Sequence, residues 1–252
     1  MDYTKYKNSS RNLKAVLFDF NGIIIKDKAV HIQLIDEILI QENLQTQRVQ
    51  ERQTFLGMSC RAYLQSLLKS RGRVLTEASI NQLLVRKAQA YVLELGKLEK
   101  LPLYSGIEDV IFQIRSRHLK LGLVSDALSS EIAMVLTSAK LAEHFSVIVS
   151  GDDISSNKPH PEGYLLAVER LNQVYPELNL KHHECLVIEH TPLGIQAAKR
   201  AQMQVVGVAN TYPFHMLQRQ ANWTIDYLID LDLQRVQEVF LGKDVQFVVP
   251  EC

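Results

Sequence analysis

Short apolar runs and helical apolar patterns occupy different parts of this chain. The first apolar run, over residues 15–20, ends in the polar turn Asn21-Gly22, which is typical of a buried strand with a tight exit. From about residue 28 to 100, apolar residues instead recur at helical spacing, as in Ile35, Ile38 and Leu39. This periodicity is typical of amphipathic helices. The pattern therefore predicts one strand followed directly by an all-helical stretch.

After about residue 103 the pattern changes to short apolar runs that alternate with helical stretches. The runs cover residues 119–124, 145–149, 185–188 and 205–208, and the helical patterns cover 129–141, 161–172, 192–202 and 213–221. Such alternation is typical of strand–helix–strand units in a parallel sheet. We therefore predict an α/β fold, with a Rossmann-like parallel sheet core and an inserted all-helical cap domain. The predicted bounds are 12–28 and 101–240 for the discontinuous core, 29–100 for the cap and 241–252 for a C-terminal tail.

Composition and charge narrow the classes of function. The chain has 252 residues, of which 46% are hydrophobic, and this suits one α/β core with an insert. Lys and Arg together number 28, as do Asp and Glu, and the zero net charge predicts no general affinity for nucleic acid or for membranes. Three widely spaced cysteines, and no apolar run suited to a signal peptide or a membrane span, favour a cytoplasmic protein. None of these features predicts an oligomeric state.

Candidate chemistry collects at the carboxyl ends of the predicted strands, where ligands bind in parallel α/β sheets. In chain order these groups are Asp19 and Asn21, then Ser125-Asp126, then Lys158-Pro159 in a loop, then Glu189-His190. Each group by itself is most simply interpreted as a turn, a loop or a helix cap. Four such groups in this order, each at a strand end, instead indicate one shared site.

The order Asp, Ser, Lys-Pro, Glu resembles that of the haloacid dehalogenase superfamily. The nearest likeness is to the branch that holds β-phosphoglucomutase and phosphoglycolate phosphatase, which also has a helical cap after its first strand, and it spans about residues 14–210. This resemblance implies a metal-dependent phosphatase or phosphoryl-transfer enzyme that acts on a small phosphorylated metabolite. Asp19 would then be a nucleophile that forms an aspartyl-phosphate. Ser125 would hold the phosphoryl oxygens, and Lys158 would neutralise the charge that Asp19 shares with the phosphate.

The resemblance also implies a metal site and contacts from the cap. A carboxylate attacks phosphorus only if its own charge and that of the phosphate are offset, and a hard cation that binds oxygens of both does this. The expected cation is Mg²⁺. The expected ligands are Asp19, the backbone carbonyl of Asn21, Glu189 and His190.

For the substrate, the expected contacts are Ser125 and Asp126 in the core and Arg52, Gly57 and Lys87 in the cap. A second interpretation of the cap cations is open, because most Arg and Lys residues on helices are solvated surface charges.

Three positions depart from the pattern of the family. Asn21 stands where this branch has an Asp that protonates the leaving oxygen, and losing such help costs roughly 10²–10⁴-fold in rate. His190 replaces a metal-binding Asp, and it either shifts the metal preference toward Mn²⁺ or Co²⁺, or points away or caps a helix. Asp126 stands where Asn is frequent, and we expect it to face away from the phosphate and to cap the following helix.

Two other functions are open from the sequence. The three departures favour a catalytically impaired relative that binds a metabolite or a protein as a regulatory module. The retained Asp19, Ser125, Lys158 and Glu189 favour an enzyme. A hydrolase in which Asp19 attacks carbon is the other alternative, although Lys158 and the cap cations suit a phosphate better.

Overall fold

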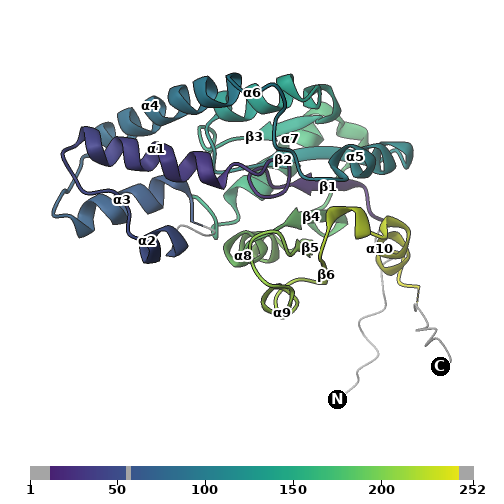
Figure 1. The fold of residues 1–252 in the computed structure, drawn as a ribbon. Helices are drawn as coiled ribbons and strands as arrows, with labels where there is room; N and C mark the ends of the chain where they lie inside the picture. The colour runs from purple at the N-terminus through teal and green to yellow at the C-terminus, as the bar shows by residue number, and fades with distance from the viewer. Residues whose placement is uncertain (1–11, 55–57, 244–252) are drawn as a thin grey trace, which may run out of the picture.

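The computed structural model describes residues 12–54 and 58–243, and these form a six-stranded sheet with helices on both faces (Figure 1). The strand order is β3-β2-β1-β4-β5-β6, and every neighbouring pair is parallel. The strands are β1 (Ala15–Phe18), β2 (Lys120–Val124), β3 (Val147–Val149), β4 (Cys185–Glu189), β5 (Gln204–Val208) and β6 (Trp223–Ile225). The predicted α/β class with a parallel sheet is thus confirmed.

Strand β1 lies between β2 and β4, and all of its residues are buried. Ala15 and Leu17 pack into an apolar cluster with helices α7 (Glu162–Val174) and α8 (Pro192–Arg200). Val16 and Phe18 pack into a second cluster with α5 (Ile107–Ser116) and α10 (Leu233–Phe240). A strand covered on both faces needs apolar residues at every position, which explains the continuous apolar run in the sequence.

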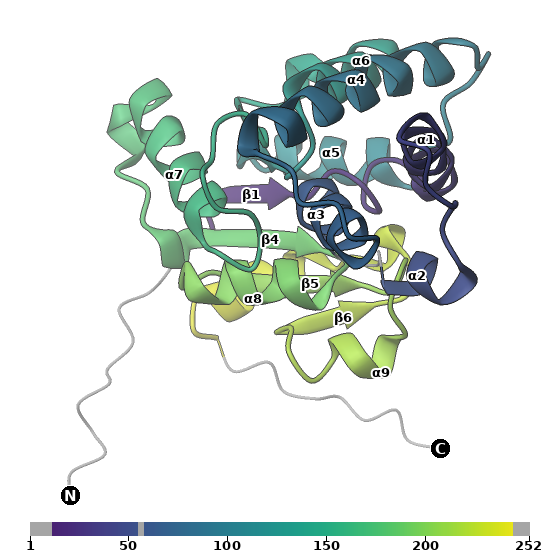
Figure 2. The same cartoon turned by 90° about the vertical axis from the view of Figure 1, so that its left-hand side faces the viewer.

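The cap is inserted between β1 and α5. Its helices are α1 (Lys28–Gln41), α2 (Val49–Thr54), α3 (Cys60–Ser70) and α4 (Glu77–Gly96). The cap has its own apolar cluster, which includes Ile35, Leu64 and Leu84. In Figure 2 the arrowheads of β1 and β4 point toward α3, so the cap covers the carboxyl ends of the strands. The chain leaves the core near Ile25 and returns at Leu103, and these two residues form an antiparallel bridge.

The remaining elements connect the sheet. They are α6 (Ser129–Ser138), α9 (Phe214–Leu217) and the 3-10 helices η2 (Ala142–His144), η3 (Pro176–Leu178), η4 (His182–Glu184) and η5 (Leu228–Asp230). The helix predicted over residues 213–221 is limited to the short α9, because the chain must turn back to enter β6 at Trp223. No helix in the described part of the chain is long and apolar enough to span a membrane.

Candidate active site

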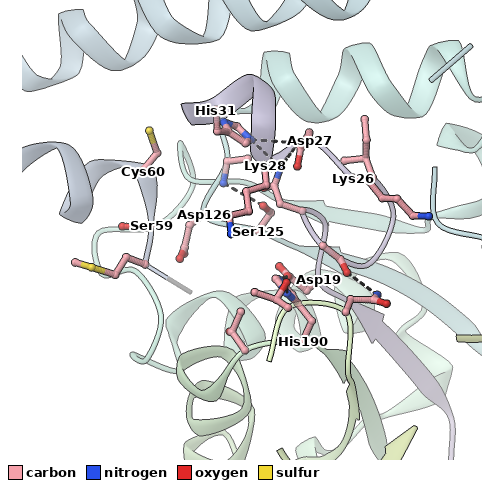
Figure 3. A pocket seen from close by; sticks show the side chains of 18 of the residues that line it. Asp19, Lys26, Asp27, Lys28, His31, Ser59, Cys60, Ser125, Asp126 and His190 are labelled. Carbon is pink, nitrogen blue, oxygen red and sulfur yellow. Dashed lines mark hydrogen bonds and ion pairs between the residues drawn. The ribbon is translucent and has the colours of Figure 1, made fainter. Parts of the chain in front are cut away.

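The four strand-end groups predicted from the sequence line one pocket between the core and the cap (Figure 3). Asp19 follows β1 directly, and its backbone N–H donates to the carbonyl of Ile188 at 3.0 Å, which continues the pairing of β1 with β4 past the strand end. Ser125 follows β2, and Glu189 ends β4. Adjacent parallel strands therefore bring these residues together, as expected for this type of sheet.

Lys158 connects two of the buried carboxylates that line the pocket, Asp19 and Glu189. Its Nζ lies 2.7 Å from Asp19 Oδ1 and 2.7 Å from Glu189 Oε1, and it also donates to the carbonyl of Val124 at 3.2 Å. Burial lowers the pKa of Lys158, but the carboxylates of Asp19 and Glu189 outweigh this and raise it well above the usual value. The ammonium group is therefore charged at any physiological pH.

Asp19 is ionised for the complementary reason. Burial of the carboxyl group raises its pKa, but Lys158 and His190 together outweigh the burial and lower the pKa to about 2. The side chain is only 7% exposed. At neutral pH the pocket thus presents a buried carboxylate anion, which is the form that a nucleophile or a metal ligand requires.

Glu189 is held on both carboxylate oxygens. Oε2 accepts from the backbone N–H groups of His190 at 2.8 Å and Thr191 at 3.1 Å, and Oε1 accepts from the hydroxyl of Tyr164 at 3.1 Å. A Cβ atom on Gly194 would overlap the carboxylate. Glycine at this position therefore allows Glu189 to lie against the first turn of α8, where the helix dipole favours a negative charge.

His190 points into the site. Its Nδ1 lies 2.7 Å from Thr211 Oγ1, and its Nε2 lies 3.1 Å from Asp19 Oδ2. The hydroxyl of Thr211 therefore orients the ring so that Nε2 faces Asp19. The alternative that His190 points away or caps the helix is wrong, because Thr191 caps α8 by accepting the N–H of Gly194 at 3.0 Å.

The residues present fit a divalent cation. Asp19, Glu189 and His190 each offer a ligand atom, and these atoms lie within 4.8 Å of one another. All three side chains are buried, and carboxylate oxygen with imidazole nitrogen is a ligand set that divalent metals accept. Asn21 lines the same pocket.

Asn21 belongs to a buried polar network that the sequence did not reveal. Its Nδ2 donates to Asp27 Oδ2 at 2.6 Å, and the same oxygen accepts from the hydroxyl of Tyr91 at 2.6 Å and lies 3.1 Å from His31 Nε2. Burial raises the pKa of Asp27, but His31, Tyr91 and Asn21 outweigh it and lower the pKa. The spacing of Asp27 and His31 at a helix start could have indicated their contact, because residues four apart share a helix face.

Asp126 lines the pocket, which contradicts the prediction that it caps the following helix. Helix α6 begins at Ser129, and the N–H of Ser129 donates to Asp152 at 2.6 Å. Asp126 stands before the cap position, so it cannot reach the first turn. Its Oδ1 instead lies 3.4 Å from the backbone nitrogen of Lys158. Burial, opposed by Lys158, raises the pKa of Asp126 to about 6.

The cap residues predicted to contact the substrate have different positions. Lys87 on α4 is 3% exposed and lines the pocket, and its Nζ lies 2.7 Å from Glu131 Oε1 on α6. Arg52 does not line the pocket, and its Nη2 lies 2.8 Å from Asp36 Oδ2. Gly57 lies outside the described residues.

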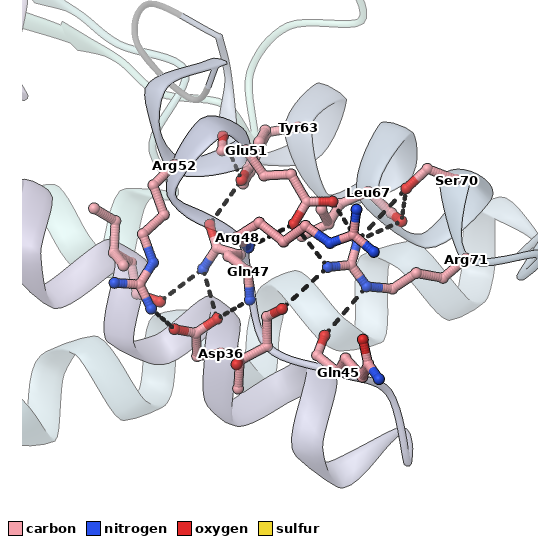
Figure 4. Close-up of polar contacts among 12 residues, drawn as sticks. Asp36, Gln45, Gln47, Arg48, Glu51, Arg52, Tyr63, Leu67, Ser70 and Arg71 are labelled. Carbon is pink, nitrogen blue, oxygen red and sulfur yellow. Dashed lines mark hydrogen bonds and ion pairs between the residues drawn. The ribbon is translucent and has the colours of Figure 1, made fainter.

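The ion pair of Arg52 belongs to a polar network that connects α1 and the end of α3 to residues 45–52 (Figure 4). Asp36 also accepts from the backbone N–H of Gln47 at 2.7 Å, and Arg71 pairs with Glu51 at 2.9 Å. Arg52 thus contributes to the internal structure of the cap, and the structure does not bring it to the pocket.

Comparisons with known proteins agree with this architecture. Residues 16–208 match the model of the family described as haloacid dehalogenase-like hydrolase. β-Phosphoglucomutase of Bacillus subtilis (strain 168) is 29% identical over 222 residues, which cover 87% of this chain and 93% of that protein. Phosphoglycolate phosphatase of Salmonella typhi is 27% identical over 229 residues, which cover 82% of this chain and 85% of that protein.

A solved structure of β-phosphoglucomutase from Clostridium difficile superposes with a TM-score of 0.77 and 23% identity, and the match covers 91% of this chain and 98% of that one. The structure of CbbY from Rhodobacter sphaeroides in complex with phosphate has a TM-score of 0.75 and 19% identity, over 87% of this chain and 96% of that one. The similarity to these two solved structures shows that the chain has the same fold. Because the family model spans most of the sequence, including every strand end that lines the pocket, the chain belongs to the haloacid dehalogenase-like hydrolases.

Proposed function

We propose that this hydrolase is a metal-dependent phosphatase or phosphoryl-transfer enzyme that acts on a small phosphorylated metabolite through Asp19. The observation that carries the proposal is the distance of 2.7 Å between Lys158 Nζ and Asp19 Oδ1 in a buried pocket. A buried ammonium beside a carboxylate offsets the charge that accumulates when the carboxylate attacks a phosphoryl group. A site that only bound a neutral compound would have no need of this pair.

The chain's own residues have distinct parts in such a reaction. An oxygen of Asp19 attacks phosphorus as the P–O bond of the ester breaks, which gives an aspartyl-phosphate and an alkoxide that takes a proton from water. A water molecule then cleaves the aspartyl-phosphate and releases phosphate. Ser125 Oγ accepts from the backbone N–H of Ala127 at 3.0 Å, so its hydroxyl hydrogen is available to a phosphoryl oxygen. Lys158 is charged before the attack, since the carboxylates of Asp19 and Glu189 hold its pKa high, and the Glu189 carboxylate remains beside it once Asp19 is phosphorylated.

A divalent cation, when bound, would offset the charges of Asp19 and the phosphate. Asp19, Glu189 and His190 would hold it, together with the backbone carbonyl of Asn21. We propose Mg²⁺, with Mn²⁺ or Co²⁺ as alternatives because the imidazole of His190 suits these metals better.

The names of the relatives support a small phosphorylated substrate, since they are a phosphoglucomutase and a phosphoglycolate phosphatase. The zero net charge of the chain supports a protein without nucleic-acid or membrane partners, and its three widely spaced cysteines support a cytoplasmic location.

One contact favours a second candidate function. The Asn21 amide is held by Asp27 at 2.6 Å, and an amide in this position does not protonate a leaving group. A catalytically impaired relative that binds a metabolite or a protein, and acts in regulation, would keep the pocket and lose the proton transfer.

A phosphatase assay separates the two candidates. Purified protein is incubated with p-nitrophenyl phosphate, acetyl phosphate and a panel of sugar phosphates, each with Mg²⁺, Mn²⁺ or Co²⁺, and Asp19→Asn is the control. Turnover that is lost in the control supports the enzyme. Equal turnover in both proteins, with every metal, contradicts the enzyme and favours the binding module. A panel of haloacids tests the attack on carbon.

A further inference from the structure

We propose that Asp126 and the Lys87–Glu131 pair make the cap side of the pocket select phosphate monoesters whose alcohol part is neutral and hydroxylated, and reject those with a second anionic group. This inference rests on the proposed function, because it names the substrate class of the same site. Five observations carry it.

The first observation is the position of Asp126. It lines the pocket next to Ser125, and in the view of Figure 3 it lies on the side of Ser125 that faces Ser59 of the cap. Two contacts of one core loop agree with this view, because the Lys158 N–H lies 3.4 Å from Asp126 and the Asn157 amide donates to Ser59 Oγ at 2.7 Å. A phosphate held by Ser125 beside Asp19 would direct the rest of its ester toward Asp126.

The second observation is that Lys87, the cap lysine that lines the pocket, already has a carboxylate partner. The Lys87–Glu131 distance is 2.7 Å, and the two side chains are 2% and 4% exposed. Both residues line the pocket. A buried pair at this distance presents little net charge, so Lys87 offers a second anion no excess positive charge.

The third observation concerns the arginines of the cap. Arg52 pairs with Asp36 at 2.8 Å, Arg61 with Glu77 at 3.1 Å, Arg71 with Glu51 at 2.9 Å and Arg86 with Glu42 at 3.7 Å. The four guanidinium groups do not line the pocket. A bidentate clamp for a second phosphate or for a carboxylate is therefore not built from these arginines.

The fourth observation concerns two lysines that line the pocket at the start of α1, Lys26 and Lys28. Both are exposed, and Lys26 Nζ lies over the ring of Tyr104 at 4.9 Å from its centroid. Water screens exposed charges strongly.

The fifth observation is that the acidic groups suit hydroxyl donors. Carboxylate oxygens accept hydrogen bonds from hydroxyl groups, and they repel phosphate and carboxylate groups at short range. A polyol such as glycerol or a sugar can donate hydrogen bonds to Asp126, whereas a second anion would lie against its carboxylate. We therefore expect discrimination by charge between esters of similar size.

The experiment measures binding, so that it does not depend on turnover. Thermal shift and titration calorimetry, both with Mg²⁺ or Mn²⁺, compare inorganic phosphate, glycerol phosphate and phosphoglycolate on the full chain. The wild-type protein should bind glycerol phosphate about tenfold more tightly than phosphoglycolate, because a like-charge contact is unfavourable. Asp126→Asn should remove most of this difference by improving phosphoglycolate, and the exposed Glu143→Gln should leave it unchanged.

Glu131→Gln is the second variant, since it frees the charge of Lys87 and should also improve phosphoglycolate. Equal binding of both esters by the wild-type protein overturns the inference, as does an unchanged preference in both variants, and so does a failure of all three compounds to bind. These outcomes are separate from the assay of Asp19-dependent turnover. A protein that turns over p-nitrophenyl phosphate but shows no charge discrimination retains the proposed function and contradicts only the inference.

Discussion

Asn21 makes the clearest prediction at the scale of single residues. Asn21→Asp restores a carboxyl group next to Asp27, and two carboxylates at this distance share one proton. The new group should therefore be partly protonated near neutral pH and able to protonate a leaving alkoxide. We expect turnover of alkyl phosphates to rise by roughly 10²-fold, with a much smaller gain for p-nitrophenyl phosphate, whose leaving group needs no proton. Phosphate release is the measurement.

Asn21→Ser is the matched control for this prediction, because it removes the amide without supplying an acid. Equal gains for the two substrate types, or an equal gain in the Ser variant, would show that the carboxyl group does not act as an acid.

Asp126 gives a prediction about stability and pH. The folded-state pKa of about 6 lies above the unfolded value of 3.8, so the folded state binds this proton more tightly and ionisation costs stability. The cost is absent below pH 3.8, grows as the pH rises toward 6, and reaches at most about 3 kcal/mol above it. In metal-free buffer, Asp126→Asn should be more stable than the wild-type protein at pH 7.5, and this gain should be much smaller at pH 4. Urea unfolding across this range is the measurement, and a gain that does not vary with pH contradicts the prediction.

Substitutions at Gly22 and Gly72 together test whether His190 holds the metal. Its φ of +78° is in the left-handed region, and a Cβ atom there would overlap the His190 ring. Gly72 has a φ of +75°, but a Cβ atom there meets nothing within 4 Å. Both Ala variants should lose about 1 kcal/mol from backbone strain. Only Gly22→Ala should also weaken Mn²⁺ binding, by displacing His190, and calorimetric titration with Mn²⁺ measures this. Similar affinities in the two variants would mean that His190 does not hold the metal.

Helices α4 and α6 are in contact, and this contact joins the cap to the core. Lys87 and Glu131 form a buried ion pair across it, and Glu131 Oε2 also accepts from the Leu128 N–H at 3.1 Å. Lys87→Met leaves a buried carboxylate without its partner and should cost about 3–5 kcal/mol in the free energy of unfolding. The double variant Lys87→Met/Glu131→Gln should recover much of that loss, since Gln keeps the hydrogen bond to Leu128. Equal stabilities of the single and double variants would contradict this account.

A helix or strand was predictable from the sequence where a single apolar pattern specifies it. A continuous apolar run specified β1, and the alternation of runs and helices specified a parallel sheet, whose neighbouring strand ends then gathered Asp19, Ser125 and Glu189. Contacts between elements were not predictable in the same way. Thr211 reaches His190 from a loop after β5, and Asp36 reaches Arg52 from the neighbouring helix. Helical spacing does not show which surface charge has a partner on another helix, and so the role of Arg52 was not visible.

At the scale of the whole molecule, the metal should stabilise the folded chain. The three proposed ligand groups come from the ends of β1 and β4, so a cation held by them should connect the centre of the sheet and be released on unfolding. A ligand at a hundred times its dissociation constant adds about 2.7 kcal/mol. We expect Mn²⁺ or Mg²⁺ to raise the melting temperature of the wild-type protein and to have little effect on His190→Ala. Differential scanning calorimetry with and without a chelator tests this, and an equal shift in the variant would place the metal elsewhere.

The bridge between Ile25 and Leu103 has a consequence for how such a chain can evolve. Paired residues in an antiparallel bridge have Cα atoms only about 5 Å apart, a span that a tight turn can close. The two connections between the cap and the core therefore lie side by side. A gene could exchange this segment for a cap of another size, or for a plain turn, without moving any strand of the sheet. For the proposed function, selectivity for the alcohol part of a substrate and the chemistry at phosphorus would then be inherited as separate modules.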